Sequence, residues 1–122
     1  MAVKYFFDSY ALIELTNGNP RYARFSDEAV IVTIFNLVEI TYSVFQQMGE
    51  QKAREVYEEF LNCVQEIDQD IVIEALALKQ KYKKRDLSYT DCLGYAFAKQ
   101  RNLRFLTGDS KFEDIENVEF VK

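Results

Sequence analysis

Four acidic side chains stand at positions from which they could meet as one set of oxygen ligands: Asp8, Glu39, Asp91 and Asp109. The first and last directly follow apolar runs, residues 3–7 and 104–108, and the other two stand near the predicted starts of helices with apolar flanks. Carboxylates that converge repel one another, and a divalent cation relieves that repulsion. If the four acids meet, they predict a Mg²⁺ or Mn²⁺ site suited to hydrolysis of phosphodiesters.

The histidine and cysteine content limits the kinds of catalysis and the metal ions that the chain could support. The chain has no histidine, which excludes Ser-His and Cys-His nucleophilic pairs and His-ligated metals. Its two cysteines, Cys63 and Cys92, lie within helical patterns and are predicted to be reduced core residues, too few for a structural zinc site. Hard oxygen ligands favour Mg²⁺ or Mn²⁺ over zinc or copper.

Each acid also has an interpretation without chemistry. Asp8 and Asp109 could be ordinary helix N-caps, because Asp is favoured at that position. Glu39 stands three residues after Asn36, which is the spacing of a capping box. Taken alone, Glu39 is better interpreted as a capping or solvated residue.

Asp91 has capping-box spacing as well, three residues after Ser88. The sequence that follows, residues 92–98, is apolar nearly all round and is predicted to be buried. Gly94 and Ala98 leave space beside Asp91 on its own helix face. A carboxylate at the mouth of a buried helix needs a partner, and a cation could serve.

The apolar patterns predict alternating strands and helices. The predicted strands are 3–7, 29–34, 104–107 and 118–121. The predicted helices are 9–17, 20–25, 37–48, 50–66, 70–84, 89–101 and 110–115. The continuous β-branched run 29–34 is typical of a strand buried on both faces of a parallel sheet. We therefore expect an α/β fold, a three-layer α/β/α domain with a mainly parallel sheet over residues 1–122, whose strand ends carry the site.

Composition sets the broad class. The chain has 122 residues, 48% of them hydrophobic, which suits one globular domain. No apolar stretch approaches the roughly 20 residues of a membrane span and no signal peptide is visible, so a cytoplasmic protein without membrane contact is expected. Net charge is −5, although one basic block interrupts the acidic surface: Lys79, Lys81, Lys83, Lys84 and Arg85. That block is predicted to be a solvated helix end; contact with an RNA backbone is the alternative.

Three segments together resemble the PIN-domain family, in particular the short VapC-type toxins. FFDSYALIEL (6–15) is similar to the first family motif, a strand ending in Asp before a helix, and TIFNLVEITYSV (33–44) is similar to the second. LSYTDCLGYAFAKQRNLRFLTGDSKFEDI (87–115) joins the third motif to the Thr-x-Asp of the fourth, and Phe112 also fits. Asn36 departs from the more usual Ser or Thr, and Tyr10 is bulky beside the first acid.

The resemblance implies a Mg²⁺- or Mn²⁺-dependent endoribonuclease acting on RNA, often a homodimer and often neutralised by an antitoxin protein. The resemblance also implies that all four acids are catalytic. We expect Asp8, Asp91 and Asp109 to hold the metal, and Glu39 to bind it directly or through water. The expected substrate-binding or supporting residues are Ser9, Asn36, Thr107, Lys83, Lys84 and Arg85. Ser9 and Thr107 could orient a carboxylate or form a local cap.

Three other functions are weighed against this hypothesis. A PIN-like module that binds RNA or an antitoxin without turnover is suggested by the acidic surface and the sparse basic residues. A phosphoacceptor receiver domain needs a late Lys-Pro step, whereas the only proline is Pro20. A haloacid dehalogenase needs a second Asp two residues after the first, where Tyr10 stands.

Overall fold

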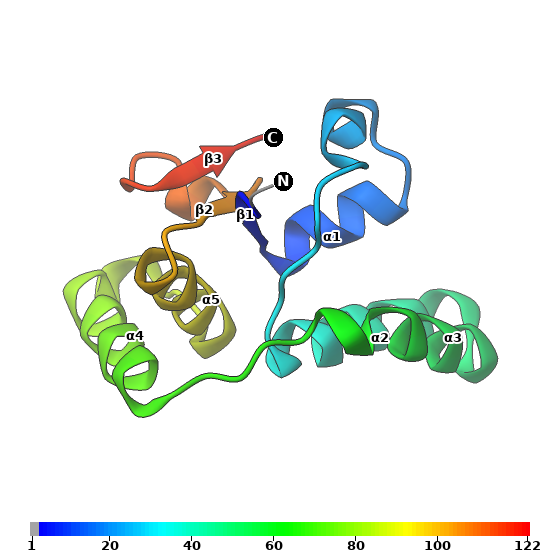
Figure 1. The fold of residues 1–122 in the computed structure, drawn as a ribbon, viewed down its shortest axis with the longest axis horizontal. Coiled ribbons are helices and arrows are strands. Elements are labelled where there is room, and N and C mark those ends of the chain that lie inside the picture. Colours follow the sequence, from blue (N-terminus) through cyan, green and yellow to red (C-terminus); the bar gives the residue numbers. More distant parts are fainter. Residues whose placement is uncertain (1–2) are drawn as a thin grey trace.

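The structure, a computed structural model, describes residues 3–122 and is built around a parallel sheet (Figure 1). Its strands are β1 (Tyr5–Phe7), β2 (Arg104–Thr107) and β3 (Val118–Phe120), in the order β1-β2-β3. The central strand β2 aligns Phe105 with Phe6 of β1 and Leu106 with Glu119 of β3. Two segments almost a hundred residues apart in the sequence are thereby neighbours, with their carboxyl ends at the same sheet edge.

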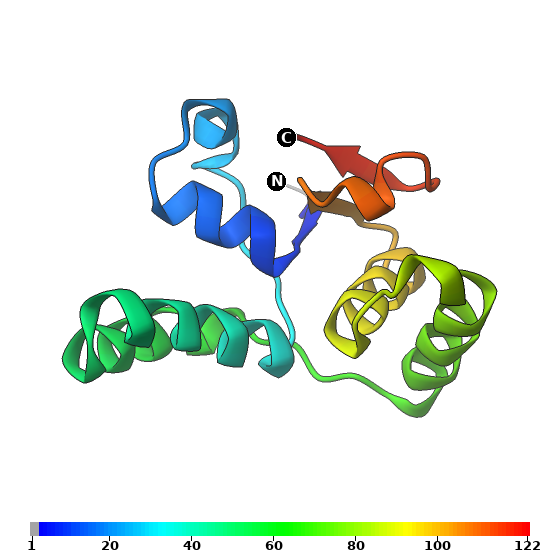
Figure 2. The ribbon, with the colours of Figure 1, turned by 180° about the vertical axis from the view of Figure 1, so that it is seen from behind.

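Helices account for most of the remaining chain. The α-helices are α1 (Ser9–Thr16), α2 (Ile34–Met48), α3 (Glu50–Phe60), α4 (Gln69–Lys81) and α5 (Tyr89–Gln100). The 3-10 turns are η1 (Pro20–Phe25), η2 (Leu61–Cys63), η3 (Lys83–Arg85) and η4 (Ser110–Phe112). Figures 1 and 2 show α4 and α5 as a pair on one side of the sheet, with α1 and η1 on the other, and α2 and α3 running outward as a separate arm. No helix within residues 3–122 combines the length and apolarity needed to cross a membrane.

Alternate strand residues bury two separate cores, because successive side chains of a strand point to opposite faces. Phe6 and Phe105 are fully buried against α4 and α5, and their rings stack at 5.9 Å. Phe7 and Leu106 are fully buried on the other face, with side chains of α1 and η1. This arrangement confirms the predicted three-layer α/β/α fold with a parallel sheet.

The predicted strand 29–34 is wrong. This segment is extended, but it contributes one backbone bond to β1, from the Phe7 N–H to the Ile31 carbonyl (3.0 Å), and one isolated parallel bridge between Val32 and Val64. Thr33 caps α2, so the helix begins at Ile34, three residues before its predicted start. The β-branched side chains favour an extended backbone, and the helix cap ends that segment before a ladder can form.

Other boundaries differ by shorter lengths. The helix predicted over 50–66 ends as α3 at Phe60, because the chain then turns so that Val64 can pair with Val32. The helix predicted over 70–84 ends at Lys81, and the one predicted over 110–115 is the single turn η4. The predictions for 9–17, 89–101 and 104–107 agree with α1, α5 and β2 to within one residue.

Candidate active site at the carboxyl ends of the strands

Asp8 lies directly after β1, and its buried carboxylate joins two strand ends. Only 3% of the residue is exposed. Its Oδ1 accepts a hydrogen bond from the Ser9 N–H (2.8 Å), so the residue also caps α1. Its Oδ2 accepts one from the hydroxyl of Thr107, the last residue of β2 (2.7 Å). Asp8 is therefore a helix cap as well as a candidate site residue, and the Thr107 hydroxyl donates to the carboxylate that it was expected to orient.

A chain of hydrogen bonds connects Asp8's neighbour to α2. The Ser9 hydroxyl donates to Oε1 of Glu39 (2.6 Å) and accepts from Nδ2 of Asn36 (3.0 Å). Asn36 is fully buried, and its Oδ1 accepts from the N–H (3.0 Å) and the hydroxyl (2.8 Å) of Thr33. Asn36 therefore caps its own helix while it orients Ser9, and Ser9 holds one oxygen of Glu39.

Glu39 does not have the capping role that its spacing suggested. The cap of α2 is Thr33, and Asn36 occupies the third helical position, so Glu39 lies in the second turn. Thr33 itself was not among the predicted site residues. The spacing Thr33-x-x-Asn36 was the available signal, since an Asn side chain can close a capping box as Glu or Gln does.

Asp91 closes a capping box at the start of α5, as predicted. Its Oδ2 accepts from the Ser88 N–H (3.1 Å), and its own N–H donates to the Ser88 hydroxyl (3.0 Å). Residues 92–98 that follow are all buried. The predicted space beside Gly94 is filled, however: a Cβ on Gly94 would lie 2.6 Å from Cε1 of Phe6. The glycine lets β1 pack against α5, so the ring of Phe6 takes the space that the missing side chain leaves.

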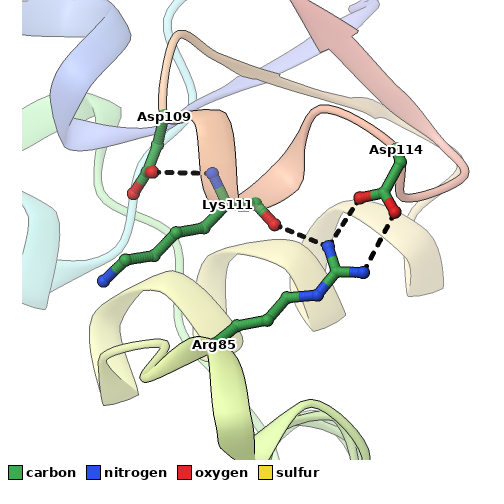
Figure 3. Close-up of polar contacts among 4 residues, drawn as sticks. All are labelled: Arg85, Asp109, Lys111 and Asp114. Carbon is green, nitrogen blue, oxygen red and sulfur yellow. Dashed lines mark hydrogen bonds and ion pairs between the residues drawn. The ribbon is translucent and has the colours of Figure 1, made fainter.

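Asp109 is tied to the same strand end as Asp8. Its N–H donates to the Thr107 hydroxyl (3.0 Å), which in turn donates to Asp8. Its Oδ1 accepts from the Lys111 N–H (3.0 Å) and caps η4, as Figure 3 shows. Asp109 is thus an N-cap, as its alternative interpretation suggested.

The acids interact electrostatically. Burial, followed by the charge of Asp91 and then of Glu39, raises the pKa of Asp8 from 3.8 to about 8, although its hydrogen bonds act in the opposite direction. Burial also raises the pKa of Asp91, with smaller contributions from Asp109 and Glu39. Without a cation the fold therefore favours the neutral form of Asp8, and a bound cation would favour its ionised form.

The donor set has the chemical type that Mg²⁺ and Mn²⁺ require, because every candidate ligand is a carboxylate. Hydrogen bonds engage one oxygen each of Glu39, Asp91 and Asp109 and both oxygens of Asp8. Within residues 3–122, no three acidic or cysteine side chains are already grouped closely enough to hold one ion. To bind one ion together, the four carboxylates would have to move closer to one another.

The basic block divides into two parts. Lys83 and Lys84 are exposed, as a solvated helix end would be. Arg85 instead forms a two-point ion pair with Asp114 (2.6 and 3.0 Å). Its expected role as a substrate-binding residue therefore competes with a structural one.

The sequence matches the PIN domain family over residues 5–118. The chain belongs to the PIN domain family, whose members are nucleases. No curated protein sequence matches the chain significantly.

Solved structures share the fold over nearly its whole length. A toxin–antitoxin complex from Klebsiella pneumoniae is 24% identical, with a TM-score of 0.75 and 95% and 96% of the two chains covered. Mycobacterium tuberculosis VapC20, a sarcin-ricin loop cleaving toxin, is 19% identical, with a TM-score of 0.76 and 97% of each chain covered. A DNA-bound VapBC from Salmonella typhimurium is 16% identical, with a TM-score of 0.73 and 98% coverage. The chain thus has the fold of VapC toxins.

Proposed function

We propose that the chain is a divalent-metal-dependent endoribonuclease of the VapC type. The observation that carries this proposal is the buried Asp8 carboxylate, held by Thr107 and Ser9 beside the charges of Asp91 and Glu39. Burial, with the charges of neighbouring acids, raises the pKa values of Asp8 and Asp91, and perturbed carboxylates of this kind cluster at functional sites. Family membership and the VapC fold support the same conclusion.

Asp8, Asp91 and Asp109 would hold Mg²⁺ or Mn²⁺, with Glu39 binding directly or through water. Such an ion, when bound, polarises a phosphate and makes a bound water more acidic. The hydroxyl of Thr107 fixes the Asp8 carboxylate and receives the Asp109 N–H, so it sets the separation of these two acids.

Ser9 and Asn36 act on Glu39 in a similar way. Both side chains are buried, and together they hold one oxygen of Glu39 at the site. The chain has no histidine, so no imidazole is available to move a proton. Carboxylates, Lys, Tyr or a metal-bound water must therefore carry out the proton transfers.

RNA cleavage tests the proposal. Wild-type protein is incubated with a fluorescent single-stranded RNA and Mn²⁺, beside Asp8→Asn, Asp91→Asn and the control Glu58→Gln, which removes an exposed charge on α3. We expect cleavage by the wild type and the control, and its loss in both site variants. Equal cleavage in all four proteins would contradict the assignment of the site.

We also propose that a protein partner, an antitoxin or a second copy of the chain, covers α2. Apolar side chains on this helix are strongly exposed: Val38 (56%), Tyr42 (61%), Phe45 (50%) and Met48 (62%). Large exposed apolar patches mark interaction surfaces, and the Klebsiella pneumoniae neighbour is a toxin–antitoxin complex. Light scattering on the isolated chain separates the two partners. A mass of twice 14.3 kDa supports a homodimer, and a mass of 14.3 kDa supports an antitoxin as the partner that covers α2.

A module that binds without turnover is the second candidate. It is favoured by the lack of a preassembled three-ligand cluster within residues 3–122. Titration of Mn²⁺ and of RNA into the protein separates the candidates. RNA binding without any Mn²⁺ binding would support the module and contradict the nuclease.

A further inference from the structure

Arg85 and Lys111 form a reciprocal clasp between the α4–α5 connection and the loop that carries Asp109. The Arg85 guanidinium donates to the Lys111 carbonyl (2.9 Å) and to both oxygens of Asp114 (2.6 and 3.0 Å). In the opposite direction, Nζ of Lys111 donates to the carbonyl of Asp86 (3.1 Å). The planar guanidinium also lies over the Tyr82 ring, 4.7 Å from its centroid. Figure 3 shows Arg85 reaching from its turn to the loop above it.

The clasp acts on the residue that contacts Asp109. Lys111 offers its carbonyl to Arg85, and its N–H donates to Oδ1 of Asp109 (3.0 Å). On the other side, Arg85 stands three residues before Ser88, whose N–H donates to Oδ2 of Asp91 (3.1 Å). One guanidinium therefore bridges the two short segments that present these acids.

We propose that Arg85 is a positioning residue: by binding Lys111 and Asp114, it sets where Asp109 lies relative to Asp91. This inference rests on the proposed nuclease function. It replaces the expectation that Arg85 contacts the substrate. Arginine suits the role because its fork reaches a carboxylate and a carbonyl together, which a lysine ammonium cannot match. The hydrogen bond from Arg85 lowers the pKa of Asp114, so the pair stays ionised at neutral pH.

The buried ring of Phe112 also anchors this loop, through contacts with Phe105 and Tyr95. Phe112 holds the turn to the core, whereas the clasp ties the loop to Arg85 and Asp86, in the connection before α5. Loss of the clasp should therefore leave the fold intact and loosen the position of Asp109. A moderate effect on metal use, without unfolding, is the expected signature.

The experiment measures the Mn²⁺ concentration and, separately, the RNA concentration that give half-maximal cleavage. The variants are Arg85→Lys, Asp114→Asn and the two combined. We expect each to raise the Mn²⁺ requirement roughly threefold to fivefold, and the double variant to add nothing, because both changes disrupt the same Arg85–Asp114 ion pair. The RNA requirement should stay unchanged. A matched control is the exposed ion pair of α3, Arg54 with Glu50 (2.8 Å), altered as Arg54→Lys.

Direct contact of Arg85 with RNA predicts a different pattern. Arg85→Lys would then change the RNA requirement and leave the Mn²⁺ requirement unchanged, and Asp114→Asn would change neither. That pattern would overturn the inference. Amide hydrogen exchange gives a readout that needs no activity, since the Lys111 N–H binds Asp109 within the clasped loop. Faster exchange at Lys111 in Asp114→Asn supports the clasp, and unchanged exchange overturns it. A wild type that cleaves no RNA with Mn²⁺ would reject the proposed function separately.

Discussion

Asp8 makes the stability of the metal-free protein depend on pH in an unusual direction. Its carboxyl is buried, and its pKa in the fold is about 8 against an ordinary 3.8. The fold thus favours the neutral form of this acid. Its contribution to stability is complete below about pH 4 and is lost as pH rises through about 8. Asp114 has the opposite dependence: its pKa is lowered by Arg85, so its stabilising contribution is present at neutral pH and is lost only as pH falls below its ordinary pKa.

The magnitude follows from the size of the shift. One pKa unit corresponds to about 1.4 kcal/mol, so raising pH from 5.5 to 8.5 should cost about 3 kcal/mol through Asp8. For a chain of this length that loss lowers the Tm by about 10 °C. Asp8→Asn removes the charge, and its amide can still meet Thr107 and the Ser9 N–H. We expect the Tm of this variant to depend much less on pH across that range, with Asp91 as the remaining buried acid whose pKa is raised.

Thermal unfolding followed by circular dichroism, in EDTA, measures both proteins at each pH. Adding Mn²⁺ at pH 8.5 should raise the Tm of the wild type, because the ion favours the ionised carboxylate. The same addition should leave Asp8→Asn nearly unchanged. A wild-type Tm that is constant over this pH range, or an equal slope in Asp8→Asn, would refute the account of Asp8.

Three further outcomes follow from the same contacts. Ser9→Ala removes the hydroxyl between Asn36 and Glu39. Urea denaturation should show a free energy of unfolding lower by about 1–2 kcal/mol, and RNA cleavage should be slower. An unchanged cleavage rate would show that Glu39 does not need the Ser9 hydroxyl. Gly94→Ala places a Cβ 2.6 Å from the Phe6 ring. The substitution should lower the free energy of unfolding by about 1–3 kcal/mol, seen as a lower Tm, while Mn²⁺ affinity is retained. An unchanged Tm would show that the ring moves aside without cost. Removing divalent ions with EDTA should stop cleavage and Mg²⁺ or Mn²⁺ should restore it, whereas activity that persists in EDTA would contradict a metal-dependent reaction.

The strand-end part of the site could be predicted from local sequence. Apolar runs that end at Asp8 and Thr107 indicate buried strands, and parallel strands place their carboxyl ends at one edge. The start of α5 could also be predicted from the sequence, because Ser88 and Asp91 have capping-box spacing and an apolar helix follows. The structure places these features as expected, while the roles of the acids as metal ligands remain a prediction.

Features of the fold and the site that depend on contacts between distant residues could not be predicted from local sequence. Residues 29–34 have the composition of a strand, but the cap at Thr33 ends the segment early. Gly94 is small because Phe6, from the other end of the chain, needs the space. Arg85 pairs with Asp114, 29 residues away, and nothing in the spacing of either residue indicated that contact.

Mn²⁺ binding to the wild type and to Asp91→Asn, measured by calorimetry, tests the shared metal site most directly. The variant should fold normally, since Asn36 already closes the equivalent capping box of α2 with an amide. It therefore removes a charge and leaves the helix start in place. We predict that the wild type binds Mn²⁺ and that Asp91→Asn weakens this affinity by more than about 100-fold. Loss of a supporting hydrogen bond alone costs roughly 10–100-fold in metal affinity. Equal affinity in both proteins, or no binding by the wild type, would contradict the metal site proposed here.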